Sequence, residues 1–280
     1  MKKISRRSFL AAAGLSVAAL ALTACGGSSA STASSVASSA AASSEAASTS
    51  AAAGELATVE AGKLTMATNA AFPPYEMTTD AGEFEGIDIE TAQAIADKLG
   101  LELQIDDMDF DAALLSVQQG KADIVMAGVT VTDERKAVMD FSDSYATGIQ
   151  SIIVPEGSDI ASPDDLAGKK IGTQRGTTGY IYCSDDFGED SVVAYDSGLT
   201  AVQALNNGQV DAVVIDNAPA TEYVAANPGL KVLDTSYAEE DYAIGMAKGS
   251  ALEDAVNKAL EELKADGTLQ AIVDKYINAN

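Results

Sequence analysis

One pattern occurs twice in the sequence, at residues 113–128 and 201–216, and this internal repeat restricts the fold more than any other feature. Each copy runs from a helical pattern through two side-chain amides to a glycine, then to an aspartate and a short apolar run. Such a run is typical of a strand covered on both faces, and alternation of helix and strand predicts a parallel α/β sheet. We therefore interpret residues 59–148 and 153–240 as two versions of one α/β unit.

Polar loops follow the predicted strands of both units. In parallel α/β sheets ligands bind at the carboxyl ends of the strands. If two such sheets face each other, we expect four loops around one cleft, namely residues 69–75, 127–132, 174–179 and 216–219. The other expected elements are strands 63–68, 101–105 and 124–126, and helices 90–99, 112–119, 252–263 and 269–276.

The first residues have the layout of a signal peptide. Four cations precede an apolar run over residues 9–22, which is too short and too rich in small residues to make a good membrane anchor. Residues 5–10 resemble a twin-arginine export signal, and an ordinary basic segment explains them equally well. Residues 22–25 resemble a bacterial lipobox, which implies cleavage after residue 24 and lipidation of Cys25.

Residues 26–53 are almost entirely Ser, Ala, Gly and Thr, a composition that cannot form a core. We assign residues 1–24 to the signal peptide and 25–57 to the lipidated cysteine and its linker. As a flexible coil this tether would reach roughly 30 Å. We therefore expect a protein held close to a membrane while its folded part stays in solution.

The charge of the mature chain excludes several kinds of partner. Cleavage removes four of the 17 Lys and Arg and none of the 42 Asp and Glu, so the formal net charge becomes 13 minus 42, or −29. That charge disfavours nucleic acids and anionic membrane surfaces as partners. After Cys25 only Cys183 remains, so we expect a buried free thiol and no disulfide framework.

The sequence contains no histidine, which excludes a Ser-His-Asp triad, a Cys-His pair and the usual zinc sites. It has neither a Walker loop nor a GxGxxG motif. The acidic segment 106–111 fails as an EF-hand because Ala112 and Gln118 occupy the sixth and twelfth positions. We interpret this segment as a solvated loop and helix cap, and we expect no cofactor.

Arg135 stands out at the end of residues 122–135. Thr132 is a predicted N-cap, and Asp133 and Glu134 suit the first helical turn. A cation at the third helical position opposes the helix dipole. An arginine beside free amides at the end of a strand is well placed to bind a carboxylate bidentately. An ion pair with Asp140 is an equally good explanation from these residues alone.

With these loops located, residues 63–277 resemble the family 3 bacterial solute-binding proteins, which are the polar-amino-acid receptors of ABC importers. The matching segments, in chain order, are residues 84–89, 122–135, 176–178, 208–216 and 263–269. Each segment is weak evidence alone, but together they cover nearly the whole mature domain.

The resemblance implies an α/β fold of the type II periplasmic-binding-protein kind, with two lobes joined by two hinge crossings. Lobe 1 would comprise residues 58–149 and 242–280, and lobe 2 would comprise residues 150–241. The crossings are expected near residues 147–153 and 235–242. A ligand bound by both lobes would favour a closed state by hinge motion.

The resemblance also implies ligand roles. Arg135 would hold the α-carboxylate of an amino acid, helped by the backbone amides of Thr130 and Thr178. Asp216 would take the α-ammonium, beside the Gly128 carbonyl and the Thr130 hydroxyl. An amino acid carries one charge of each sign, so its site needs both opposite charges. Considered alone, Asp216 is equally well explained as the cap of a following helix.

Four further positions would contact the ligand side chain according to the same resemblance. Phe72 and Phe110 would sandwich it, although phenylalanines are usually core residues, and Asn69 and Gln174 would meet its polar end. Many members that bind basic amino acids carry an acid where this chain has Asn69. The ligand therefore stays open among glutamine, histidine, cystine, arginine and lysine.

The resemblance predicts a monomeric lipoprotein, anchored on the extracytoplasmic side of the cell membrane, that captures a polar or basic amino acid and delivers it to an ABC permease. It predicts no enzymatic activity and no metal or nucleic-acid partner. The alternatives are an amino-acid-sensing or adhesive surface lipoprotein and a dehydratase-like enzyme on the same fold. Glu76 is the one candidate acid or base for such an enzyme.

Overall fold

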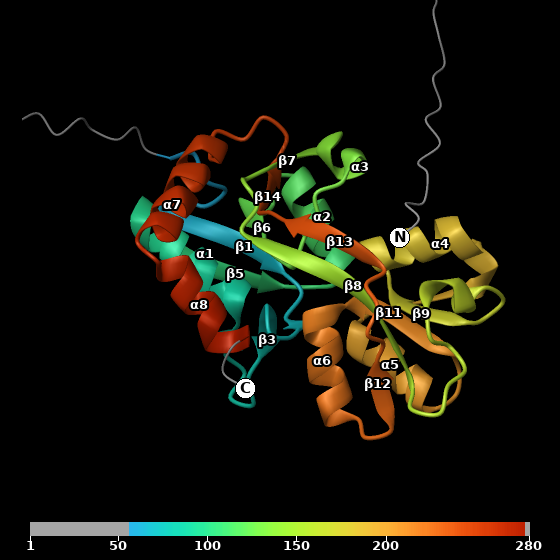
Figure 1. Cartoon of the computed structure of the whole chain (residues 1–280). Coiled ribbons are helices and arrows are strands. Elements are labelled where there is room, and N and C mark those ends of the chain that lie inside the picture. The colour runs from blue at the N-terminus through green and yellow to red at the C-terminus, as the bar shows by residue number, and fades with distance from the viewer. Residues whose placement is uncertain (1–55, 278–280) are drawn as a thin grey trace, which may run out of the picture. The chain divides into compact units, whose positions relative to one another are not determined.

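The computed structural model describes residues 56–277, which contain two large β-sheets with helices around them (Figure 1). The strands of the first sheet are β1 (Lys63–Thr68), β5 (Glu102–Asp107), β6 (Ile124–Val125), β7 (Met139–Phe141) and β14 (Gly245–Ala247). Their order is β5-β1-β6-β14-β7. β1 is parallel to β5 and β6, whereas β14 is antiparallel to β6 and β7.

Helices cover both faces of the first sheet. They are α1 (Ile87–Leu99), α2 (Phe110–Gln118), α7 (Glu253–Ala265) and α8 (Thr268–Ile277), and α3 (Asp133–Lys136) is a single turn before β7. Successive side chains of a strand point to opposite faces. Leu64 and Met66 of β1 therefore pack with α1, α7 and α8, while Ala67 packs with Phe110 and Val117 of α2.

The second sheet has the order β10-β9-β11-β8-β12, and a further strand, β13, pairs with β8. Its strands are β8 (Ala146–Pro155), β9 (Ile171–Gln174), β10 (Val192–Tyr195), β11 (Ala212–Asp216), β12 (Leu230–Val232) and β13 (Ala238–Tyr242). The parallel strands β9, β10 and β11 lie on one side of β8, which is antiparallel to all its partners.

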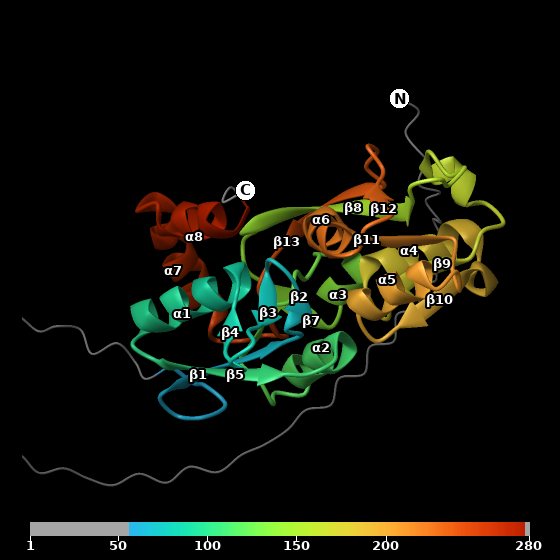
Figure 2. The ribbon, with the colours of Figure 1, turned by 90° about the horizontal axis from the view of Figure 1, so that it is seen from below.

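Three helices pack on the second sheet, which Figure 2 shows from below. They are α4 (Thr178–Phe187), α5 (Gly198–Asn206) and α6 (Asn217–Ala226), and two 3-10 helices span Pro163–Leu166 and Glu189–Ser191. Val213 and Ile215 of β11 pack with α5 and α6, whereas Val214 packs with Cys183 of α4. Cys183 is buried and free, as predicted.

The chain passes twice between the sheets, once from β7 into β8 and once from β13 into β14 (Figure 1). β8 and β13 lie side by side as an antiparallel pair, with Ala146 opposite Tyr242 and Gln150 opposite Ala238. An isolated bridge joins Thr130, in the loop after β6, to Tyr242. The polar loops of the first sheet therefore lie against the strand pair that leads to the second.

The predicted repeat is present in the structure. α2 leads into β6 and α5 leads into β11, and β6 pairs in parallel with β1 as β11 does with β9. Gly120 and Gly208 stand at the same point of the two copies, and each has a φ of 66°. This left-handed conformation favours glycine, which explains why both copies carry it there.

Two features near the first helix differ from the sequence-based expectation. α1 begins at Ile87, three residues before the predicted start, because Gly86 takes a φ of 131° and closes on the chain at Tyr75. A small sheet of β2 (Ala71–Phe72), β3 (Glu76–Thr78) and β4 (Phe84–Glu85) was not predicted. Strands of two or three residues are too short to show an alternating pattern.

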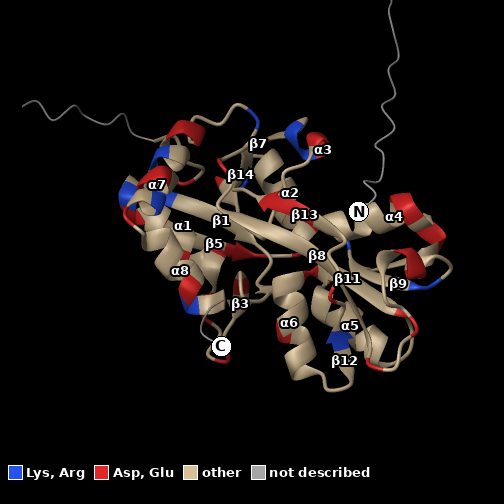
Figure 3. Cartoon of the chain, viewed as in Figure 1, with Lys and Arg blue, Asp and Glu red and all other residues tan. Residues whose placement is uncertain are grey.

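The acidic segment 106–111 lies at the end of β5 and the start of α2, where Asp109 is the N-cap residue and Asp107 accepts a hydrogen bond from the Ala70 amide at 2.8 Å. Acidic side chains are spread over the described chain, and Lys and Arg are fewer (Figure 3). Within residues 56–277 no helix is both long and apolar enough to cross a bilayer. The predicted signal peptide, Cys25 and most of the linker lie outside the described residues.

Candidate functional site

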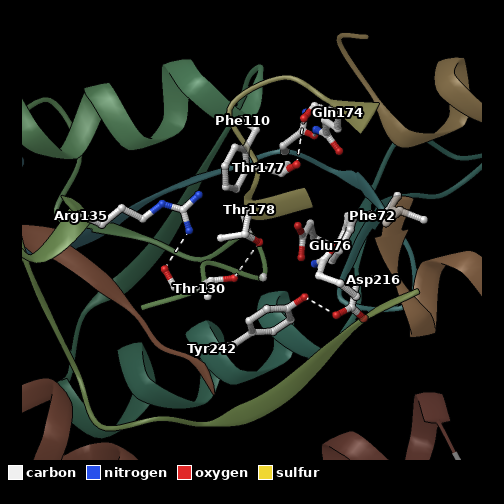
Figure 4. A pocket seen from close by; sticks show the side chains of 15 residues that line it. Phe72, Glu76, Phe110, Thr130, Arg135, Gln174, Thr177, Thr178, Asp216 and Tyr242 are labelled. Carbon is white, nitrogen blue, oxygen red and sulfur yellow. Dashed lines mark hydrogen bonds between the residues drawn. The ribbon is translucent and has the colours of Figure 1, made fainter. Parts of the chain in front are cut away.

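A cavity with about 410 Å³ of empty space, including its open side, lies between loops of the two sheets (Figure 4). Its lining residues sit at or just after the carboxyl ends of β1, β6, β9 and β11, where parallel sheets bind ligands, and on the small sheet and the strand pair. They are Asn69, Phe72, Glu76, Phe110, Ala127, Gly128, Thr130, Arg135, Gln150, Gln174, Thr177, Thr178, Ile215, Asp216 and Tyr242.

All nine residues that the sequence analysis named as ligand-binding line this one cavity. Six of them come from segments around the first sheet and three from the second, and all except Phe110 and Arg135 lie within the four predicted loops. Gln174 Nε2 donates a hydrogen bond to Asn69 Oδ1 at 2.9 Å and so joins the two groups. The structure therefore brings these residues together, and their contacts with a ligand stay a prediction.

Arg135 is held at one end of the cavity by the predicted cap: Thr132 Oγ1 accepts from the Arg135 amide at 3.2 Å. Its guanidinium donates to the Thr130 carbonyl at 2.8 Å and to the Gly176 carbonyl at 3.2 Å, and lies 5.4 Å from the centre of the Phe110 ring. Arg135 is only 9% exposed. Burial lowers the pKa of its guanidinium, whereas the negative charge of Glu240 raises it.

Arg135 does not pair with Asp140, the alternative left open by the sequence. Asp140 instead accepts from Lys248 at 2.6 Å. Among the described residues no carboxylate forms an ion pair with Arg135. A buried guanidinium bonded only to carbonyl oxygens keeps a full positive charge for an anion to neutralise.

Asp216 lies at the other end of the cavity and is 2% exposed (Figure 4). Its Oδ2 accepts from the Tyr242 hydroxyl at 2.6 Å and from the Ile149 amide at 2.8 Å, and its Oδ1 accepts from the Ala218 amide at 3.2 Å. The last bond caps α6, so Asp216 is both a helix cap and a cavity residue. Burial raises its pKa to about 6, although these hydrogen bonds lower it.

The two phenylalanines lie between the hydrophobic core and the cavity, and the predicted sandwich around a ligand side chain stays a prediction. Phe110 and Phe72 pack against hydrophobic core clusters and also line the cavity. The Phe72 ring stacks on Tyr75 with ring centres 5.8 Å apart. Gly128 has a φ of 54°, and a Cβ atom there would lie 2.9 Å from the Phe72 ring. Glycine at this position therefore lets the aromatic wall approach the loop after β6.

Glu76 is a cavity residue to which the sequence analysis gave no ligand role. It is fully buried, and neither of its carboxylate oxygens has a donor within hydrogen-bond distance. Burial, and then the negative charge of Asp88, raises its pKa well above the usual range. Asp88 Oδ2 accepts from the Gly128 amide at 3.0 Å and from the Tyr145 hydroxyl at 2.8 Å. Glu76 was missed because its hairpin was not predicted.

Five further lining residues were not named as ligand contacts in the sequence analysis, namely Ala127, Gln150, Thr177, Ile215 and Tyr242. Gln150 and Tyr242 lie on β8 and β13, which were predicted only as crossings between lobes. β8 contains a continuous apolar run at residues 152–154 and β13 has three consecutive acids, so neither strand shows the alternation of a half-buried strand. Nothing in the sequence therefore marked Gln150 and Tyr242 as part of a site.

The packing of Gly148 against Asp216 gives a testable prediction. A Cβ atom at Gly148 would lie 2.5 Å from Tyr242 Cζ and 2.6 Å from Asp216 Oδ2. Gly148→Ala is therefore expected to separate this hydrogen-bonded pair, to cost about 1–3 kcal/mol of folding stability, and to weaken ligand binding in the cavity about tenfold. Thermal unfolding and calorimetry measure the two effects.

The matched control is Gly157→Ala, because a Cβ atom at Gly157 meets nothing within 4 Å. This variant is expected to match the wild-type protein in both measurements. If Gly148→Ala binds as tightly as Gly157→Ala does, the position of Asp216 is not important for binding.

Comparison with known proteins gives a family. Residues 64–279 match the model for bacterial extracellular solute-binding proteins, family 3. A probable histidine-binding protein of Neisseria gonorrhoeae is 34% identical over 274 residues, which are 95% of this chain and 94% of that protein.

Two solved structures resemble the fold. The arginine-, lysine-, histidine-binding protein ArtJ of Geobacillus stearothermophilus has a TM-score of 0.74 and 34% identity, covering 78% of this chain and 96% of that one. An ancestral arginine-binding protein bound to glutamine has a TM-score of 0.73 and 42% identity, covering 78% of this chain and 99% of that one. The architecture is therefore that of the type II periplasmic binding proteins, as the sequence predicted.

Proposed function

The chain belongs to family 3 of the bacterial extracellular solute-binding proteins, and on that premise we propose that its cavity binds a free amino acid with a cationic side chain. Proteins of this family capture amino acids for ABC transporters and are binding proteins, not enzymes. The function of this chain is accordingly to capture an amino acid and deliver it to an ABC permease. The proposal adds which atoms hold the ligand and which side-chain charge the cavity accepts.

The two ends of the cavity suit the two charges that every free amino acid carries. Arg135 would bind the α-carboxylate through its guanidinium, together with the backbone amides of Thr130 and Thr178. Asp216 would bind the α-ammonium, next to the Gly128 carbonyl and the Thr130 hydroxyl. Support for this orientation comes from the burial of both charges and from the lack of an oppositely charged partner for either among the described residues.

The charge of the cavity lining is the observation that carries the choice of side chain. The acidic and basic lining residues are Arg135, Asp216 and Glu76, and the raised pKa of Glu76 favours its neutral form in the empty cavity. An α-carboxylate and an α-ammonium neutralise the first two, and Glu76 is left without a counter-charge. A buried carboxylate is stable only if it is paired or neutral. A ligand side chain with a positive charge would supply the pair and would favour the ionised form of Glu76.

Four other residues would hold the body of the side chain. Phe72 and Phe110 form apolar walls, and an aromatic face attracts a guanidinium or ammonium group. Asn69 and Gln174 add amide groups to the cavity lining and are joined to each other by a hydrogen bond. ArtJ, which is described as an arginine-, lysine-, histidine-binding protein, also favours this ligand class, whereas the ancestral arginine-binding protein is bound to glutamine.

A matched pair of ligands tests the proposal. L-Arginine and L-citrulline have nearly the same shape, but only arginine carries a positive side chain. We expect L-arginine to stabilise the protein more than L-citrulline in a thermal-shift assay, because a charged hydrogen bond to Glu76 is worth about 1.5–3 kcal/mol, or roughly tenfold or more in affinity. L-Lysine, L-histidine, L-glutamine and L-cystine complete the screen.

The variant Glu76→Gln removes the unpaired acid and keeps its shape. It is expected to reduce the preference for L-arginine over L-citrulline to about threefold or less, since the neutral amide accepts a neutral ligand equally well. Glu83→Gln, at an exposed acid in the loop before β4, is the control. Tighter binding of L-citrulline or L-glutamine by the wild-type protein would contradict the cationic assignment and leave amino-acid binding intact.

The division into lobes and the anchoring of the chain belong to the same proposal. Residues 58–149 with 242–280 would move against residues 150–241 about the strand pair, closing on the ligand. A monomer tethered through lipidated Cys25, after removal of residues 1–24, would keep this domain on the extracytoplasmic side of the membrane near its permease. Support comes from the lipobox-like residues and the small-residue linker.

A further inference from the structure

Glu240 on β13 does not line the cavity, but it contacts three residues that do. Its Oε2 accepts hydrogen bonds from Thr130 Oγ1 at 3.0 Å, from Thr178 Oγ1 at 3.0 Å and from Gln150 Nε2 at 3.1 Å. The donors come from the loop after β6, the start of α4 and β8. Glu240 itself is 6% exposed, so the junction is buried.

These contacts determine where the hydroxyl protons point. A threonine hydroxyl has one proton and two lone pairs, and a carboxylate only accepts. The protons of Thr130 and Thr178 are therefore both directed at Glu240 Oε2. The two hydroxyl oxygens lie 3.4 Å apart, and with both protons committed neither donates to the other. The Thr130 hydroxyl consequently presents lone pairs, and no proton, to the cavity.

We infer that Glu240 is a positioning residue that makes the Thr130 hydroxyl an obligate acceptor for the α-ammonium of the ligand. The inference rests on the proposed orientation of the amino acid, with its ammonium at the Asp216 end. A hydroxyl free to rotate would turn its proton toward the cavity in part of the population, and a proton there repels an ammonium. With Glu240 in place, Thr130 and Asp216 both offer only acceptor atoms to that group.

A purely structural role is the alternative, since Glu240 also ties β13 to the loop after β6. The two roles differ in what they require of Thr130. If Glu240 acts through the hydroxyl, its replacement costs affinity only while that hydroxyl exists. If it acts by holding the backbone, the cost is the same whether residue 130 carries a hydroxyl or not. A double-mutant cycle separates these cases.

The experiment measures binding of L-arginine by calorimetry to the wild-type protein, Glu240→Gln, Thr130→Val and the double variant. Each single change is expected to weaken binding about tenfold, because each removes or misdirects a hydrogen bond to a charged group. The double variant is expected to bind as Thr130→Val does. Glu239→Gln, at the exposed neighbour of Glu240 on the same strand, is expected to bind as the wild type does.

A second probe reports on the ammonium itself. 5-Guanidinopentanoic acid is L-arginine without its α-amino group, and displacement of L-arginine measures its affinity. Glu240→Gln and Thr130→Val are expected to change this affinity by less than about threefold, because the probe has no ammonium for the hydroxyl to accept from. If Glu240→Gln does not fold, Thr130→Val with the two probes still tests the inference.

Two results would overturn the inference. The first concerns the affinity for L-arginine: either Glu240→Gln does not weaken binding at all, or it weakens binding as much in the Thr130→Val background as it does in the wild-type protein. The second is an equal loss for L-arginine and for 5-guanidinopentanoic acid. Failure of the proposed function would give a different result. If the wild-type protein prefers another amino acid, such as L-glutamine or L-histidine, the same double-mutant cycle is measured with that amino acid. If it binds no amino acid, the proposed function itself is wrong.

Discussion

Arg135→Ala is expected to weaken binding of the amino acid by about 2–5 kcal/mol, which is roughly thirty-fold or more in affinity. The physical reason is that the guanidinium is buried, keeps its whole charge and is bonded only to the Thr130 and Gly176 carbonyls. Without it, the α-carboxylate would enter the cavity with no counter-charge. Calorimetry on the purified folded domain measures the change.

Lysine at position 135 is not expected to restore binding, because an ammonium lacks the planar fork that holds a carboxylate through two bonds. Arg175→Ala is the control: this arginine is more than half exposed and forms a surface pair with Asp196 at 3.4 Å. We expect the control to bind as the wild type does. Normal binding by Arg135→Ala would show that the carboxylate lies elsewhere.

Asp216→Asn is expected to have an effect of similar size, about 2–5 kcal/mol, on the same binding reaction. The amide has nearly the same shape, but its single oxygen can accept either from Tyr242 and Ile149 or from the Ala218 amide that caps α6. The ligand-free variant is expected to unfold within a few degrees of the wild-type temperature, because the lost hydrogen bond offsets the gain from removing a buried carboxylate. A loss of binding much larger than the loss of stability then reports the missing charge opposite the α-ammonium. Asp196→Asn, at an exposed acid, is the control.

The acidity of Asp216 gives an independent readout in the wild-type protein. Its pKa is raised to about 6 by burial, and a bound ammonium would lower it. Binding then releases a proton below that pH, so affinity is highest above pH 6 and is lost as the pH falls through it. From pH 7.5 to pH 5 we expect about a tenfold loss.

Asp88 and Glu76 also have raised pKa values, so the pH dependence needs a ligand control. 5-Guanidinopentanoic acid has no α-ammonium and therefore cannot favour the ionised form of Asp216. The difference in pH dependence between this acid and L-arginine therefore isolates the Asp216 contribution. The same slope for both ligands would contradict an ammonium at Asp216.

The sequence contained enough information for the α/β fold because its main elements are long and bounded by glycines. The repeat at residues 113–128 and 201–216 gave helix and strand in both sheets, with Gly120 and Gly208 in matching left-handed turns. Asp216 is the last residue of β11, and Arg135 lies on α3, beyond the loop that follows β6. The predicted sheet topology indicated a cleft between the loops, whereas the assignment of both residues to one ligand came from the family resemblance.

Other parts of the site were not predictable because they depend on short elements and on long-range packing. Glu76 lies in a hairpin whose strands have two or three residues, and Asp88 of α1 is the charge that most raises its pKa after burial. Tyr242 lines the cavity, and Glu240 contacts lining residues, from a strand that pairs with residues almost a hundred positions earlier. No local pattern in the sequence reports a contact of that range.

The most direct test of the zwitterion site is a crystal structure of the protein with the amino acid that stabilises it most. We expect the α-carboxylate at about 2.7–3.1 Å from the Arg135 guanidinium nitrogens, and the α-ammonium at a similar distance from the Asp216 carboxylate. A ligand bound in the reverse orientation, or outside the cavity between the two sheets, would contradict the account.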